Sequence, residues 1–79
     1  MTLRFAGTDI EVKVENIPTK EYTDEHGWRT VKAFQAVEAM EMDMPDGIVR
    51  IEKGGYIVFS KGRMYPSRED IFDTGYREV

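Results

Sequence analysis

Apolar and polar residues alternate in two stretches near the N-terminus. Residues 3–5 and 10–14 each place apolar side chains at every second position, with polar side chains between them. Alternation with a period of two is typical of strands that bury one face. The pattern predicts strands over 3–5 and 10–14, joined into a hairpin by the turn at residues 6–9. Pro18 follows the second strand and ends it, because proline has no N–H to donate to a ladder.

Residues 30–44 carry a pattern that fits either a helix or a strand. In a helix over 31–40, the apolar residues share one face. In a strand over 38–44, the methionines point to one side and the acidic residues between them to the other. An Asp-Gly turn at residues 46–47 favours a hairpin into the apolar residues that follow. The local pattern leaves both readings open.

The last third of the chain has clearer signals. Residues 56–59 are apolar on both faces, which is typical of a strand in the middle of a sheet. A Ser-Lys-Gly turn leads into a further strand over 63–65, which the next residue, a proline, ends. Ser67 followed by Asp70 fits a capping box and predicts one short helix over 67–73.

These elements predict a small α+β domain. The 79 residues leave room for one domain, residues 1–79. Its core is thin, because a chain this short buries only about 60% of its surface on folding. We expect a curved antiparallel β-sheet of about five strands with one short helix near 67–73. The helical reading of residues 30–37 adds a second short helix.

Composition excludes several classes of protein. The chain has no cysteine and one histidine, His26, so it has neither a disulfide framework nor the three or four ligands of a zinc site. No apolar run approaches the roughly 20 residues of a membrane span. The first residues also lack the apolar core of a signal peptide. We expect a cytoplasmic protein with no metal and no cofactor.

The motifs of common enzymes are also missing from the sequence. Ser60 and Ser67 do not lie in a nucleophile elbow, and His26 is the only histidine to serve as a base. Gly54 and Gly55 match neither a P-loop nor a dinucleotide-binding fingerprint. We therefore predict no catalytic residues and no enzymatic activity.

Acidic and basic residues occupy separate segments. Residues 33–47 contain acids and no base, whereas residues 48–68 contain five bases and one acid. The acids of the first segment are Glu38, Glu41, Asp43 and Asp46. One interpretation is that two neighbouring strands pair opposite charges across a sheet. The other is that the acids form a face that docks on a basic partner protein and is steered there by charge.

Two aromatic residues are candidate anchors for a protein partner. Tyr22 and Trp28 flank a polar turn, and aromatic side chains often supply much of the binding energy of an interface. A simpler interpretation is that Trp28 fills the thin core. The candidate partner-binding residues are therefore Glu38, Glu41, Asp43, Asp46, Tyr22 and Trp28.

A basic hairpin supports a different hypothesis. Tyr56 and Tyr65 lie among basic residues, and such a combination binds single-stranded nucleic acid in many proteins. The bases are Arg50, Lys53, Lys61 and Arg63. The net charge of −4 argues against a nucleic-acid partner.

Short motifs in the second half resemble a family of small phage and prophage proteins. The motifs are Gly55-Tyr56-Ile57-Val58, Lys61-Gly62, Tyr65-Pro66, Asp70-Ile71-Phe72 and Tyr76 through Val79. They are similar to a signature of that family that runs Gly-Asp-Tyr-Ile-Val, Lys-Gly, Tyr-Pro and Asp-Ile-Phe before a final Tyr and Val. The likeness covers about half of the chain and departs at Gly55, where the family usually has Asp.

This resemblance implies an origin and a fold, because the family has no characterised biochemical role. It implies a gene of phage or prophage origin and a strand over residues 36–44. Many small acidic phage proteins inhibit host defence, and anti-CRISPR proteins are prominent among them. By that analogy we expect a stoichiometric inhibitor that binds a host defence protein, such as a type I CRISPR effector complex, through an acidic face.

Two further hypotheses stay open. The first is an accessory protein of phage structure or assembly, and the second is a small nucleic-acid-binding module. Exposed strand edges allow either a monomer or a homodimer formed by edge pairing.

Overall fold

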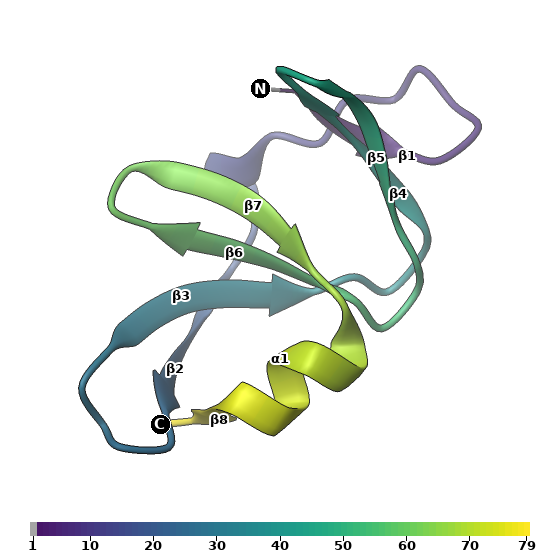
Figure 1. The fold of residues 1–79 in the computed structure, drawn as a ribbon. Helices are drawn as coiled ribbons and strands as arrows, with labels where there is room; N and C mark the ends of the chain where they lie inside the picture. The colour runs from purple at the N-terminus through teal and green to yellow at the C-terminus, as the bar shows by residue number, and fades with distance from the viewer. Residues whose placement is uncertain (1) are drawn as a thin grey trace.

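The computed structural model describes residues 2–79, which form eight strands, one α-helix and one 3-10 turn (Figure 1). The strands make two antiparallel sheets, one of five strands and one of three. In chain order the elements are β1 (Leu3–Phe5), the 3-10 turn (Val14–Asn16), β2 (Lys20–Asp24), β3 (Thr30–Gln35), β4 (Met40–Met44), β5 (Gly47–Ile51), β6 (Tyr56–Ser60), β7 (Arg63–Ser67), α1 (Glu69–Gly75) and β8 (Tyr76–Glu78). The predicted α+β class is confirmed, with the strands divided between two sheets.

The five-stranded sheet runs in the order β7-β6-β3-β2-β8, and α1 covers one of its faces (Figure 1). Phe72 of α1 is 2% exposed and stacks on Tyr56 of β6, with 4.1 Å between the ring centroids. Val31 and Ala33 of β3 and Val58 of β6 belong to the same buried cluster. Because helices of about two turns are unstable alone in water, this packing is what holds α1 in place.

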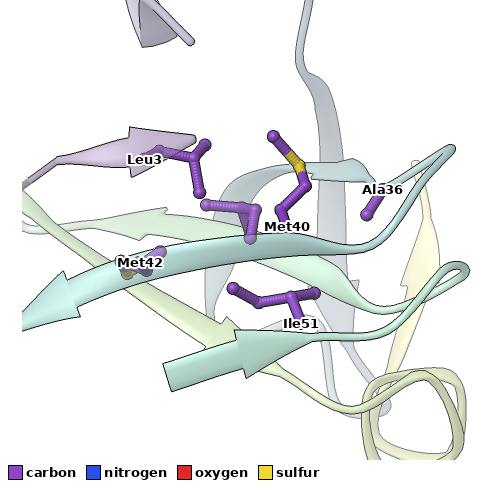
Figure 2. Packing of buried hydrophobic residues seen from close by; sticks show 6 residues of the cluster. Leu3, Ala36, Met40, Met42 and Ile51 are labelled. Carbon is purple, nitrogen blue, oxygen red and sulfur yellow. The ribbon is translucent and has the colours of Figure 1, made fainter. Parts of the chain in front are cut away.

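The three-stranded sheet runs in the order β1-β4-β5 and forms a second buried cluster. Leu3, Met40, Met42 and Ile51 meet on its inner face (Figure 2). Ile57 of β6 lies in this cluster too, although the residues on either side of it face α1. β6 is therefore buried on both faces, as predicted for a central strand, and it links the two cores.

Within residues 30–44 the chain forms strand β3, a short connection at 36–39 and strand β4, so the helical reading of 31–40 is wrong. β3 pairs with β2 on one side and with β6 on the other. This pairing satisfies the backbone groups that a helix would satisfy internally. In β4 the methionines face the core while Glu41 and Asp43 face outward, which confirms the strand predicted over 38–44.

The segment after β1 differs from the predicted strand over 10–14. It makes one isolated bridge, between Arg4 and Glu11, and then enters the 3-10 turn. Two backbone hydrogen bonds, with N···O distances of 3.2 and 2.7 Å, hold it against β1. The hairpin stays short because β1 has only three residues with which the following segment can pair.

The C-terminal helix is confirmed, but its predicted start is wrong. α1 begins at Glu69 with Arg68 as the N-cap residue, and the N-cap side chain makes no capping hydrogen bond. The expected capping box between Ser67 and Asp70 is therefore absent. Ser67 instead ends β7, which also contains Pro66. The proline is tolerated because β7 is an edge strand, with one open side.

Candidate binding surface

Two of the four predicted acids already have a basic partner within the chain. Arg4 of β1 places Nη1 3.1 Å from Asp43 Oδ2 and Nε 3.5 Å from Glu41 Oε1. In the register of β4 and β5, Glu41 also lies opposite Arg50. Cross-strand pairs of opposite charge stabilise a sheet locally. The charges of Glu41 and Asp43 are thus largely compensated on the outer face of this sheet.

The other two acids do not complete an acidic face. Glu38 and Asp46 are exposed, and they lie beyond opposite ends of β4. The four residues are therefore split into a compensated pair and two separate charges. A continuous acidic docking face formed by all four residues stays a prediction.

Tyr22 belongs to the core beneath α1. Its residue surface is 9% exposed, and its ring meets the edge of Phe72 at a centroid distance of 5.0 Å. Burial, followed by the charge of Glu78, raises the pKa of Tyr22. Tyr22 packs the interior and presents little surface to a partner.

Trp28 lies on the loop between β2 and β3 and is 82% exposed. Its backbone N–H donates a hydrogen bond of 2.8 Å to Oδ1 of Asp24. Gly27, with φ of 73°, supplies the left-handed backbone that the turn requires. The indole stacks on His26 with 4.8 Å between centroids and 28° between planes. The interpretation that Trp28 fills the core is therefore wrong, and the residue is a surface aromatic.

The carboxylate of Asp24 organises this loop. Desolvation raises the pKa of Asp24, but backbone N–H donors of the loop, that of Trp28 foremost, lower it by more, so the net shift is downward. The ionised carboxylate that accepts these bonds is the form present at neutral pH. Trp28 is thus held outward by a turn that is already formed.

A hollow of about 510 Å³ lies beside Trp28 and is lined by residues of the paired strands β3 and β6. Lys32 and Phe59 are register partners there, on the sheet face that points away from α1. The lining residues are Trp28, Arg29, Thr30, Val31, Lys32, Phe59, Ser60 and Lys61. Three of them are bases and none is an acid, so the hollow has a positive character.

Sequence patterns did not single out Arg29 or Lys32 as candidate site residues. Lys32 is an exposed position of β3, which alternates exposed and buried residues from Thr30 to Ala33. Had this segment been assigned to a strand, its alternation would have placed Lys32 on the open face. Lys61 reaches the same hollow from the turn between β6 and β7, a connection that only the sheet order reveals.

The basic hairpin predicted for nucleic-acid binding is not a single surface. Arg50 and Lys53 line a different hollow, near the end of β7, whereas Lys61 lies at the β6–β7 turn. The five residues of β6 separate these places by roughly 17 Å. Tyr56 is 7% exposed, and its hydroxyl donates a hydrogen bond to Asp73, so it does not offer its ring for stacking.

Two features, a metal-ligand cluster and a membrane-spanning helix, are absent from the described part of the chain. Within residues 2–79, no three His, Cys, Asp or Glu side chains are grouped so that they would hold a metal ion. In the same part of the chain, no helix has the length and apolar character needed to cross a membrane.

Comparison of the chain with protein-family models, with curated proteins and with solved structures finds no match in any of the three.

Proposed function

We propose that this protein is a stoichiometric binding protein that docks on another protein through Trp28 and the hollow beside it. The observation that carries the proposal is the 82% exposure of Trp28 in a loop held by Asp24. Burying a tryptophan side chain removes roughly 150–250 Å² from water, which corresponds to about 4–6 kcal/mol before the losses of association are subtracted. A preformed loop also reduces the ordering that binding requires.

The biological setting of the proposal is inhibition of host defence by a phage-derived protein. The support is the resemblance of residues 55–58 and 70–72 to the phage family, together with the small size of the chain. The most specific form of this proposal is an anti-CRISPR protein that occupies a surface of a type I effector complex. Such an inhibitor acts by occupancy, one molecule per site and without turnover.

We place the docking surface at Trp28 rather than at the acidic residues. Arg4 already pairs with Glu41 and Asp43, so these carboxylates would exchange one ion pair for another on binding. A surface ion pair contributes little free energy, typically about 0–1 kcal/mol. Burial of the indole therefore dominates the expected affinity.

A functional assay with matched variants tests this proposal. Host cells with an active type I CRISPR system are challenged with a targeted phage while they produce the protein. The wild type is expected to restore plaque formation, and Trp28→Ala is expected to reduce it by at least tenfold. Ile71→Ala is the matched control, because Ile71 is a 60% exposed apolar residue on α1, away from the hollow.

Binding to the purified effector complex complements the assay. We expect the wild type to co-elute at a fixed stoichiometry and Trp28→Ala to elute separately. Equal restoration by Trp28→Ala and the wild type would contradict the proposed surface. Absence of any effect on defence, with capture of virion proteins instead, would favour the assembly role.

A further inference from the structure

Three bases around the hollow make no close ion pair. Arg29, Lys32 and Lys61 form no ion pair within 4.0 Å among residues 2–79, whereas Arg4 and Arg50 each do. The chain is acidic overall, with a net charge of −4. Cations that no carboxylate contacts, gathered at one place on an acidic protein, are the complement of an anionic ligand.

Lys61 occupies an uncommon backbone conformation for a lysine. Its φ is 53°, and the next residue, Gly62, has φ of 75°, as in a type I′ hairpin turn. Asparagine, aspartate and glycine are the usual residues at the first of these positions. The turn therefore accepts backbone strain while it directs a cation to the rim of the hollow.

Acids on the surrounding surface restrict which anion fits. Glu21 lies opposite Lys32 in the register of β2 and β3, and Asp24 and Glu25 belong to the loop that carries Trp28. A polynucleotide carries phosphates at every step, so a strand that leaves the hollow would meet these carboxylates. The carboxylates of a protein segment stand on flexible side chains that can turn toward the three bases and away from these acids, whereas phosphates are fixed in the nucleic-acid backbone, so a protein segment avoids much of this repulsion.

We propose that the hollow beside Trp28 receives an acidic segment of the partner protein, whose carboxylates pair with Arg29, Lys32 and Lys61. This inference rests on the proposed function and names the chemistry of the partner. β3 and β6 are interior strands with both backbone edges paired, so the segment is held through side chains and not by strand addition. The indole of Trp28 supplies the apolar contact at the edge of the hollow.

Trp28 is the single tryptophan of the chain, so its fluorescence reports on this site alone. The purified protein is titrated with three probes of equal length: a capped hexaglutamate peptide, a capped hexalysine peptide and hexathymidylate. We expect a saturable change in Trp28 emission with hexaglutamate, weakened by added salt, and no saturable change with hexalysine. Hexathymidylate is expected to bind at least fivefold more weakly than hexaglutamate.

Charge-reversal variants test whether hexaglutamate binds at the bases of the hollow. The double variant Lys32→Glu with Lys61→Glu is expected to weaken hexaglutamate binding at least tenfold. The control is Lys13→Glu with Lys53→Glu, which makes the same change in net charge at exposed lysines outside the hollow and is expected to stay within twofold of the wild type. Circular dichroism of both double variants confirms that they are folded.

Several results would overturn the inference. They are the absence of a saturable response to hexaglutamate, equal or tighter binding of hexathymidylate, and equal weakening by the control variant. The phage assay separates this failure from failure of the proposed function. If Trp28→Ala loses activity but the Lys32→Glu, Lys61→Glu protein keeps it, only the acidic-segment inference fails. If Trp28→Ala keeps full activity, the proposed function itself fails.

Discussion

The hydroxyl of Tyr56 donates a hydrogen bond of 3.0 Å to Oδ1 of Asp73, joining the central strand β6 to α1. Phe72, which precedes Asp73 in α1, stacks on Tyr56 and on Tyr76, with 4.1 and 4.9 Å between the ring centroids. The aromatic stack and the hydrogen bond together anchor the short helix to the sheet. The position of α1 on the five-stranded sheet therefore depends on contacts between residues distant in the sequence.

Alkaline pH is expected to destabilise the fold through Tyr56. Burial, then the hydrogen bond to Asp73, raises the pKa of Tyr56 to about 12 from the ordinary value of 10.0. Between pH 10 and 12 the unfolded chain loses this proton while the folded chain retains it, so the free energy of unfolding falls as pH rises. The loss amounts to about 2–3 kcal/mol in total and is absent below pH 10.

Denaturant unfolding of the wild type and Tyr56→Phe across this pH range checks the prediction. The difference between the two proteins isolates Tyr56 from the other groups that titrate there. We expect the wild type to lose stability more steeply than Tyr56→Phe. If the free energy of unfolding falls equally with pH in the two proteins, the pKa of Tyr56 is not raised in the folded state.

Removal of the Arg4 side chain is expected to expose the charge repulsion between Glu41 and Asp43. The Arg4 side chain is 19% exposed and lies between the two carboxylates. We expect Arg4→Leu to lower the free energy of unfolding by about 1 kcal/mol, since each partly exposed pair contributes modestly. The loss should diminish as salt is added.

A double-mutant cycle with Asp43→Asn measures the coupling directly by denaturant unfolding. A coupling energy of about 0.5–1 kcal/mol is expected for the closer pair, at 3.1 Å. A coupling energy of zero would mean that Arg4 does not stabilise the charge of Asp43. In that case the acids of β4 would again qualify as a docking surface.

Substitution of Gly55 is expected to be destabilising. A Cβ at this position would lie 2.8 Å from Cγ2 of Ile51 and 3.1 Å from the backbone oxygen of Glu52. The backbone oxygen has little freedom to move, so we expect Gly55→Asp to cost about 1–3 kcal/mol.

Gly75→Ala is the matched control for this experiment. No atom lies within 4 Å of a Cβ built at Gly75, the last residue of α1. Alanine is favoured over glycine by about 0.5–1 kcal/mol in a helix interior and by less at a helix end, so a gain of at most about 0.5 kcal/mol is expected. Thermal unfolding compares both variants with the wild type, and a tolerated Gly55→Asp would contradict the steric explanation.

The sequence by itself determined the regular parts of the fold. Alternation over residues 3–5 and the doubly apolar run at 56–59 predicted strands because side chains on a strand point to opposite faces. The Lys61-Gly62 turn was predicted from local chemistry, and the helix near 67–73 was found to within two residues at each end. These signals succeed because each depends on neighbours only a few residues away.

Only the tertiary structure decided how residues 30–44 fold and which side chains are exposed. A helix pattern over 31–40 gave way to β3 because β2 and β6 supply backbone partners on both sides. Tyr22 and Trp28 looked equivalent in the sequence, yet Phe72 packs against the first, whereas the second stays 82% exposed with the ring of His26 stacked on it. Burial, charge pairing and strand order depend on contacts between distant segments, and local periodicity carries no record of those contacts.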